Sequence, residues 1–441
     1  MANLITNVSK YLMILLIAIY TYYNFRFFGV GDEDQKRHLC RLQNVILVLI
    51  HTLAYTIIYL RTEDEKALMF FGAQLLFFFL YMGLYRLFYH NLSRLLLNNA
   101  CMLLSTSFII MTRLSMDRAV RQFAIVVAAA AVTMIIPFIM DRAWQLSKIS
   151  WVYGSIGLLL LLVVCVMGNT AFGAQLSITI GGFSFQPSEF VKISFVFFVA
   201  TMFYRSTDFK TVVITTAAAA AHVLVLVLSK DLGSALIFFV TYLLMLFVAT
   251  NNWLYLGLGA GRGSAAAVFA YQMFSHVRTR VEAWLDPWSD IAGKGYQISQ
   301  SLFAIGTGGW FGMGLYQGMP SKIPVVEKDF IFSAISEELG GIYALCLILI
   351  CLGCFMQFML IAVRMQAMFY KLIAFGLGTA YIVQVFLTIG GVTKFIPSTG
   401  VTLPFVSYGG SSILSTFIVF NVVQGLYILK RNEEEEEYEA E

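Results

Sequence analysis

Three short charged clusters interrupt a chain that is otherwise mainly apolar. The first contains Glu189 and Lys192, the second Asp231 and the third Asp329. Charges at the edge of membrane-spanning segments are unfavourable without a partner, so each cluster is a candidate functional site. Glu189 and Lys192 are three residues apart, hence on one face of a helix, where they can neutralise each other. Asp231 could instead simply cap the helix that follows it.

The third cluster continues into an apolar segment with a polar stripe. Asp329, Ser333 and Ser336 stand at positions i, i+4 and i+7 of an expected helix, so they share one face. Glu337 and Glu338 would follow about two turns below Asp329, which is deep for unpaired carboxylates. Packing alone does not explain this pattern, which favours a functional carboxylate.

A fourth segment, 397–412, contains two prolines and three glycines and opens into the last apolar run. It includes Ser407 and ends in Gly409, Gly410, Ser411 and Ser412. Backbone N–H groups at such a helix start could hold an anion such as pyrophosphate. A rigid re-entrant loop with ordinary helix caps would have the same spacing, so both readings stay open.

The composition is that of a membrane protein. Apolar residues make up 59% of the 441 residues and charged residues only 12%, whereas soluble domains carry about 25% charge. Uncharged windows such as 232–261 and 395–429 exceed the roughly 20 residues that a transmembrane helix needs. They are continuous rather than alternating, which favours helices over a β-barrel. The six cysteines lie mostly in apolar runs, so no disulfide framework is expected.

The expected fold is therefore an all-α polytopic membrane protein. The long connection at about 275–328 mixes aromatic residues with glycines, which suits short helices forming a platform at the membrane interface. The thirteen predicted spans are 11–30, 43–60, 67–89, 97–116, 119–140, 151–168, 189–205, 210–229, 232–250, 252–273, 329–363, 369–393 and 405–429.

Basic residues gather in alternate connections, which predicts orientation because cytoplasmic loops carry excess lysine and arginine. Thirteen spans place the N-terminus outside and the C-terminus, with an acidic and disordered tail at 431–441, in the cytoplasm. The loop holding Arg113, Arg118 and Arg121 breaks this rule, since it falls outside. The basic residues on the cytoplasmic side are Arg26, Lys36, Arg37, Arg41, Arg86, Arg94, Arg142, Lys148, Arg364, Lys371, Lys430 and Arg431.

Five segments in this order resemble the SEDS family (shape, elongation, division and sporulation), which includes FtsW, RodA and SpoVE. The segments are FSFQPSEFVK ending at Lys192, DLGSAL at 231–236, GKGYQISQSLFAIGTGG at 293–309, DFIFSAISEELG at 329–340 and STGVTLPFVSYGGSS at 398–412. The resemblance implies a ten-span core at 97–430 with a cavity open to the outside. Residues 1–96 are then extra N-terminal helices.

The resemblance also implies a peptidoglycan glycosyltransferase. Members like this polymerise lipid II, an undecaprenyl-pyrophosphate-linked disaccharide, into glycan strands for division, elongation or sporulation, beside a class B penicillin-binding protein. The family's essential aspartate corresponds to Asp329, which we expect to be the general base for the attacking sugar hydroxyl. Its glutamate, lysine and second aspartate correspond to Glu189, Lys192 and Asp231.

The leaving diphosphate needs positive charge. Candidates are Lys192, Arg280, a divalent cation (Mg²⁺ or Mn²⁺) and the amides of 409–412. Supporting positions are Gln297, Lys394 and Ser407, in or beside the matching segments.

Some positions depart from the family pattern. Gln175 and Leu176 follow Gly173-Ala174 where relatives carry an Arg-Trp pair, and Lys230 replaces a common proline. Two alternatives to the enzyme stay open: a flippase for the lipid-linked precursor, or a non-catalytic scaffold for the penicillin-binding protein. A transporter should carry charges along a path to both faces. Here the motif charges gather outside, which favours outer-face chemistry.

Overall fold

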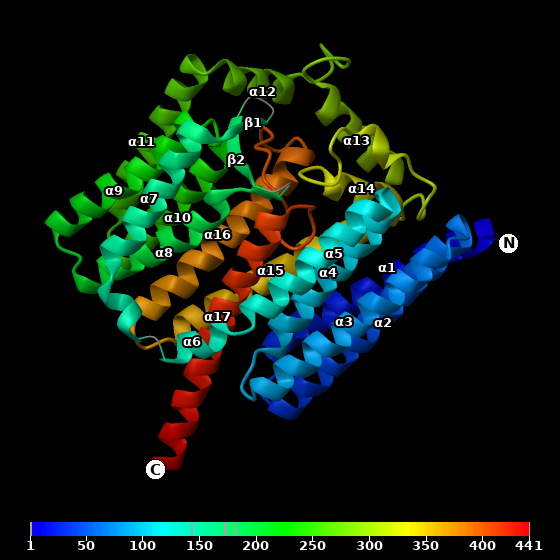
Figure 1. Cartoon of the computed structure of the whole chain (residues 1–441), viewed down its shortest axis with the longest axis horizontal. Helices are drawn as coiled ribbons and strands as arrows, with labels where there is room; N and C mark the ends of the chain where they lie inside the picture. The colour runs from blue at the N-terminus through cyan, green and yellow to red at the C-terminus, as the bar shows by residue number, and fades with distance from the viewer. Residues whose placement is uncertain (1, 143, 172–173, 181–182, 441) are drawn as a thin grey trace.

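The computed structural model describes residues 2–142, 144–171, 174–180 and 183–440, which fold into a long helical bundle (Figure 1). Twelve helices in these ranges are long and apolar enough to cross a membrane. The prediction of an all-α polytopic membrane protein is thus confirmed. One exception is a small antiparallel sheet of order β1–β2–β3, made of Asn169–Ala171, Ala174–Ile180 and Phe183–Phe185, which the sequence did not predict.

Three helices form the N-terminal part: α1 (Ala2–Gly29), α2 (Glu33–Thr62) and α3 (Glu65–Phe88). Helix α2 begins ten residues before the predicted span at 43–60, because Asp32 caps it by accepting from the amides of Asp34 and Gln35. The spans of the remaining bundle are α4 (Arg94–Leu114), α5 with α6 (Met116–Thr133 and Ile136–Arg142), α7 (Ser150–Met167), α8 (Pro187–Arg205), α9 (Phe209–Leu228), α10 (Leu232–Thr250), α15 (Gly341–Arg364), α16 (Met368–Val392) and α17 (Gly410–Ala440).

The predicted span at 252–273 is the helix α11 (Trp253–Met273), which is not among the twelve. It runs antiparallel to α10: Gly259 lies against Leu243 and Gly263 against Phe239. Helix α11 therefore covers the same depth as α10. The acidic tail, expected to be disordered, instead continues α17 as far as Ala440.

The connection at 275–328 contains the short helices α12 (Ser275–Leu285) and α13 (Tyr296–Gly308) and a 3-10 turn η2 (Pro320–Lys322). This segment, which we call the platform, packs α13 against α14 (Ile331–Leu339). The single span predicted at 329–363 is wrong, because α14 and α15 are separated at Gly340. Its φ is +96° and a Cβ there would lie 2.5 Å from the backbone N of Gly312, so only glycine fits.

The start of α14 removes Asp329 from the predicted polar stripe. Helix α14 begins at Ile331, so Asp329 lies in the preceding turn rather than on a helix face. Ser333 bonds the Ser301 hydroxyl of α13 at 2.6 Å, and Ser336 donates to the carbonyl of Phe332. Both serines are packing contacts of α14.

Arg113 and Arg118, which break the predicted pattern of basic loops, form ion pairs with residues on either side of Asp329. Arg113 Nε donates to Glu338 Oε1 at 2.8 Å, and Arg118 pairs with Glu327. Glu337 Oε1 accepts from the amide of Met319 at 2.8 Å. The expectation of an unpaired carboxylate is therefore wrong for Glu338, whereas Glu337 has this hydrogen bond but no ion-pair partner among the described residues. Arg113 and Arg118 therefore have ion-pair partners on α14 and on the platform, which is a structural reason for their position in the loop that breaks the predicted lysine and arginine pattern.

We expect Arg113→Gln to destabilise the protein more at pH 8 than at pH 5. Burial raises the pKa of Glu338 to about 7, against the opposing effect of Arg113. In the folded protein Glu338 is therefore protonated near pH 5. At that pH the ion pair contributes little to the wild type, so its removal has little effect. Above pH 7 the wild-type carboxylate is ionised and paired, whereas the variant must bury an unpaired carboxylate or protonate it at a raised pKa, a loss of up to roughly 3 kcal/mol. Thermal unfolding in detergent at both pH values measures it; an equal loss at both would contradict this account.

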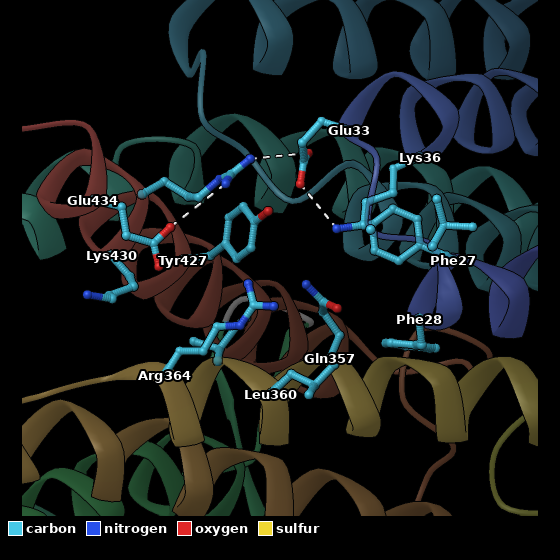
Figure 2. Close-up of a pocket in the computed structure, with 14 residues that line it drawn as sticks. Phe27, Phe28, Glu33, Lys36, Gln357, Leu360, Arg364, Tyr427, Lys430 and Glu434 are labelled. Atoms are coloured by element: carbon cyan, nitrogen blue, oxygen red, sulfur yellow. Dashed lines mark hydrogen bonds and ion pairs between the residues drawn. The ribbon is translucent and has the colours of Figure 1, made fainter. Parts of the chain in front are cut away.

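Polar contacts hold the N-terminal helices against the rest of the bundle. Asn99 of α4 donates to Asn24 of α1 at 2.7 Å and accepts from Tyr20 at 3.1 Å. At the end remote from the platform, Arg431 of α17 binds Glu33 of α2 at 3.1 Å (Figure 2). The first three helices are therefore packed on the bundle along its length.

Candidate functional site

A cavity of about 280 Å³ lies where the platform meets the ends of α8 and α10. Six of the sequence-predicted site residues line it: Glu189, Lys192, Asp231, Arg280, Gln297 and Asp329. Residues up to 140 positions apart in the sequence are thus brought to one place. The other lining residues are Ser177, Gln186, Ser188, Lys230, Ser234, Ile237, Phe238, Val325, Lys328, Thr399, Gly400, Val401 and Thr402.

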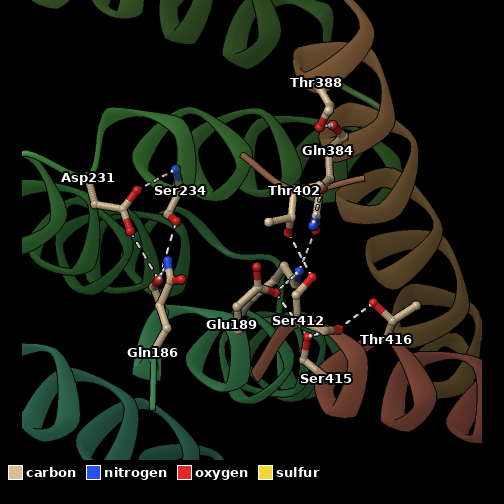
Figure 3. A network of polar contacts seen from close by, with 12 residues as sticks. Gln186, Glu189, Asp231, Ser234, Gln384, Thr388, Thr402, Ser412, Ser415 and Thr416 are labelled. Atoms are coloured by element: carbon tan, nitrogen blue, oxygen red, sulfur yellow. Dashed lines mark hydrogen bonds and ion pairs between the residues drawn. The ribbon is translucent and has the colours of Figure 1, made fainter. Parts of the chain in front are cut away.

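Asp231 is held by hydrogen bonds on one wall of this cavity (Figure 3). It accepts from the amide of Ser234 at 3.1 Å, which makes it the N-cap of α10, and from the hydroxyl of Ser188 at 3.0 Å. Burial raises the pKa of this carboxyl, and the hydrogen bonds from Ser234 and Ser188 oppose the rise. The capping role is therefore real, and the same residue faces the cavity.

Glu189 and Lys192 form the predicted ion pair. Lys192 Nζ lies 2.9 Å from Glu189 Oε2, and both side chains are about 90% buried. Lys192 also donates to Gln384 of α16 at 2.6 Å, and Glu189 accepts from Ser415 of α17 at 2.9 Å. Figure 3 shows these polar groups converging from three helices. Because every partner is fixed, the Lys192 ammonium is held in place beside the cavity.

Asp329 enters the cavity from the turn before α14. The carbonyl of Glu327 accepts from the Tyr408 amide at 2.8 Å, and the Ser407 hydroxyl donates to the carbonyl of Lys328. Ser407 in turn accepts from the amide of Leu403 at 2.8 Å. The predicted supporting residue Ser407 thus holds the backbone that presents Asp329.

Arg280 of α12 lies opposite Asp329, with Gly400 between them. A Cβ on Gly400, whose φ is +73°, would lie 3.8 Å from Arg280 Nη2 and 3.9 Å from Asp329 Oδ2. Arg280 is anchored by donating to the carbonyl of Ser398 at 3.3 Å. Burial raises the pKa of Asp329, while Arg280 and Lys328 oppose the rise. The arginine therefore helps to keep Asp329 ionised.

Cations exceed carboxylates in the lining. Lys192, Lys230, Arg280 and Lys328 face three carboxylates, those of Glu189, Asp231 and Asp329. Lys328 and Lys230 were both absent from the predicted site residues, although Lys230 was a candidate to replace the cation missing near position 176. Each directly precedes a motif aspartate, which was the available signal. This surplus of positive charge suits a phosphate-bearing ligand.

The remaining predicted residues lie around the cavity rather than in its described lining. The Gly409 amide donates to Gln122 at 3.3 Å, so this amide is already engaged. Gly410 begins α17, and Ser411 Oγ accepts from the amide of Gln186 at 2.9 Å. Ser412 bonds Thr402 at 2.8 Å. These contacts attach the start of α17 to the cavity walls. They engage the Gly409 amide and the hydroxyls of Ser411 and Ser412, so an anion site at the amides of 410–412 stays a prediction.

Lys394 contributes its backbone rather than its ammonium to the described contacts. It has a φ of +60°, and its carbonyl accepts from the Trp284 indole of α12 at 3.1 Å. The contact ties the platform to the end of α16. The predicted departure at Gly173, together with the side chains at 174–176, lies outside what the structure describes.

An apolar groove of about 590 Å³ adjoins the polar cavity, and the two share Arg280 and Thr399. Its walls come from α9, α10, α11 and α16. Apart from Arg262 and Arg280, the groove is lined by apolar or small uncharged side chains: Val223, Val227, Leu232, Ala235, Leu236, Phe239, Gly263, Ala266, Ala267, Ala270, Val277, Val281, Phe386, Leu387, Ile396, Pro397, Ser398 and Thr399. A charged cavity that opens onto such a groove suits an amphipathic molecule.

Among the described residues, no group of three or more histidine, cysteine, aspartate or glutamate side chains could hold a metal ion. Asp231 and Asp329 are nevertheless carboxylates in one cavity. Mg²⁺ is usually bound through one or two carboxylates together with substrate phosphates. The donor set therefore fits a divalent cation only if a phosphate ligand brings it.

Comparison with known proteins places the whole bundle after α3 in one family. A model described as a cell cycle protein, covering FtsW, RodA and SpoVE, matches residues 85–432. The peptidoglycan glycosyltransferase RodA of Mycobacterium tuberculosis is 35% identical over 316 residues, which cover 67% of each chain. A probable peptidoglycan glycosyltransferase FtsW of Aliivibrio salmonicida is 33% identical, over 71% of this chain and 81% of the relative.

Two solved structures share the fold. One comes from work titled "Structural coordination of polymerization and crosslinking by a peptidoglycan synthase complex". It has a TM-score of 0.65 at 22% identity and covers 77% of this chain and 98% of its own. The rod shape determining protein RodA of Thermus thermophilus has a TM-score of 0.55 at 20% identity, over 76% and 96%.

Proposed function

This chain belongs to the FtsW/RodA/SpoVE family of cell cycle proteins and is a peptidoglycan glycosyltransferase, and we propose that it polymerises lipid II into glycan strands with Asp329 as general base. The observation that carries this proposal is the polar cavity joined to an apolar groove through Arg280 and Thr399. A diphosphate beside Arg280 would leave its polyprenyl chain in the groove and its sugars in the cavity.

In the proposed reaction the carboxylate and the cations of the cavity have separate roles. A sugar hydroxyl is a poor nucleophile, so a carboxylate that accepts its proton in the transition state lowers the barrier. Asp329 performs this step on the 4-hydroxyl that attacks the anomeric carbon of the donor. The bond from that carbon to the diphosphate breaks, and fixed cations at Lys192 and Arg280 stabilise the negative charge that develops on the leaving oxygen.

A divalent cation, Mg²⁺ or Mn²⁺, is an additional proposal for this site. Asp231 or Asp329 would hold it together with the diphosphate oxygens, and it would supply Lewis-acid stabilisation of the leaving group. The residues of the cavity do the remaining work: Arg280 keeps Asp329 ionised, and Lys192 presents a fixed positive charge.

The reaction is proposed for the outer face of a bacterial cytoplasmic membrane, with the N-terminus outside and the C-terminus in the cytoplasm. The distribution of lysine and arginine supports this orientation, now that Arg113 and Arg118 have a structural reason to be outside. A class B penicillin-binding protein is the proposed partner. One similar structure is described as a synthase complex that coordinates polymerisation and crosslinking.

The test is a polymerisation assay with the purified full-length chain, a class B penicillin-binding protein, labelled lipid II and a divalent cation. Long glycan products are the expected result. A scaffold would yield none of its own, even with an active partner. A flippase would yield none either, but would move labelled lipid II across vesicles, and that pair of results would overturn the proposal.

Arg280→Gln should both slow polymerisation and move the acidic limb of its pH profile. Removing Arg280 raises the pKa of Asp329 further, because the arginine opposes the effect of burial. A general base works only when ionised, so activity of the variant should fall at a higher pH than wild type as the medium is acidified. Initial rates from pH 5 to 9 measure the shift. A slower variant with an unmoved limb would restrict Arg280 to binding diphosphate.

A further inference from the structure

A second cavity, of about 360 Å³, lies at the opposite end of the bundle from the catalytic one. The direction of two helices fixes its place. Helix α1 runs from Lys10, which donates to the carbonyl of Gly312 on the platform, to Phe27 and Phe28 at the cavity. Helix α15 runs from Gly341, bonded to Gly309, to Arg364. The two cavities therefore face opposite sides of the membrane.

The walls of this cavity come from two parts of the chain. The N-terminal helices contribute Phe27, Phe28, Val30, Gly31, Glu33 and Lys36. The family-matching part contributes Gln357, Leu360, Ile361, Arg364, Tyr427, Lys430 and Arg431, and Glu434 follows it on α17. The site therefore exists only because the extra helices pack against α15 and α17.

The lining is basic overall, with four cations (Lys36, Arg364, Lys430 and Arg431) and two carboxylates. Glu33 binds Lys36 at 3.1 Å and Arg431 at 3.1 Å, while Glu434 lies 3.8 Å from Arg431. Arg364 has no ion-pair partner within the described ranges, and Figure 2 shows its guanidinium directed into the cavity beside Tyr427 and Gln357. Lys430 is also paired, with Glu433 at 3.6 Å. Arg364, which is solvent-exposed, is thus the unneutralised cation of this open cavity.

Apolar side chains form the membrane side of the same cavity. Phe27, Phe28 and Ile361 line it, and Leu360 is 40% exposed at its edge. The ends of four spans (α1, α2, α15 and α17) meet here, at the level expected for lipid headgroups. Basic pockets between transmembrane helices on the cytoplasmic side are suited to anionic headgroups. A soluble phosphate would use the cations but would gain nothing from the aromatic wall.

We propose that this cavity binds the phosphate of an anionic phospholipid, with Arg364 as its principal contact and the acyl chains running over Phe28 and Leu360. The lipid would bridge the N-terminal helices and α15, beside the Glu33–Arg431 contact. This assignment does not depend on the reaction in the other cavity. On the proposed topology it concerns lipid of the cytoplasmic leaflet.

The test is a lipid titration of the delipidated full-length chain in detergent, followed by native mass spectrometry. Phosphatidylglycerol is compared with phosphatidylcholine of the same acyl chains. Arg364→Gln should weaken phosphatidylglycerol binding about five-fold, and Arg364→Lys should largely retain it. Glu33→Gln should strengthen binding, because it frees Lys36 and Arg431, and a merely misfolded variant would not do so.

Arg86→Gln is the matched control. Arg86 is exposed in the last turn of α3, at the same end of the bundle, and is not among the cavity's lining residues. Equal binding by Arg364→Gln and wild type would overturn the proposal, as would equal losses in Arg364→Gln and Arg86→Gln. Displacement of the lipid by millimolar glycerol 3-phosphate would also overturn it, and would assign the cavity to a soluble phosphate compound.

Discussion

Asp329→Asn is expected to reduce glycan-strand synthesis by roughly 10²- to 10⁴-fold, the usual contribution of a general base. Asparagine has nearly the shape of aspartate but cannot accept the proton of the attacking hydroxyl. The backbone of residues 327–328 is held by Ser407 and Tyr408, contacts that the substitution leaves in place. Loss of activity should therefore occur without loss of folding. Labelled lipid II converted per minute, with the partner protein in excess, measures the effect.

The matched control is Asp117→Asn. Asp117 lies exposed in the first turn of α5, at the same outer end of the bundle and away from the cavity lining. It should polymerise like wild type. Persistent polymerisation by Asp329→Asn would contradict the assignment of the base. In that case Asp231, the other unpaired carboxylate in the lining with a raised pKa, would be the next residue to replace.

The sequence alone predicted much of this site. Glu189, Lys192, Asp231 and Asp329 were identified because charge is rare in this chain, and the structure places all four around one cavity. Periodicity and local charge were sufficient where the partner is near in sequence, as for the ion pair three residues apart. That these four residues share one site was predicted from the family resemblance, because no local sequence pattern shows that distant segments meet.

Partners distant in sequence were missed for a physical reason. Whether Glu338 is unpaired depends on Arg113, which stands 225 residues away in the sequence. Neither segment contains a local pattern that predicts this contact. The break at Gly340 depends in the same way on the close backbone of Gly312. Gly409 to Ser412 have the composition of an anion site, but Gln122 already accepts from the Gly409 amide and the Gln186 amide donates to the Ser411 hydroxyl. Such competition between protein and ligand is decided by tertiary packing.

Lys192→Met is the second substitution with a large expected effect, and the effect is on stability. It leaves the Glu189 carboxylate about 90% buried without its cation. Removing one member of a buried ion pair typically destabilises a protein by roughly 3–5 kcal/mol. The hydrogen bond from Ser415 to Glu189 remains, but a neutral hydroxyl does not compensate a charge. Thermal unfolding in detergent should show a large decrease in midpoint.

The double variant Glu189→Gln/Lys192→Met tests whether Lys192 acts only in the ion pair or also in catalysis. Replacing both charges removes the unpaired group, so most of the lost stability should return, as it does when whole buried pairs are replaced by neutral residues. If Lys192 also stabilises the leaving diphosphate, polymerisation should stay low in this stable variant. Recovery of both stability and activity would contradict that role and make the pair a structural element of α8. Because the two readouts are measured on one folded protein, a loss of activity in it cannot be attributed to unfolding.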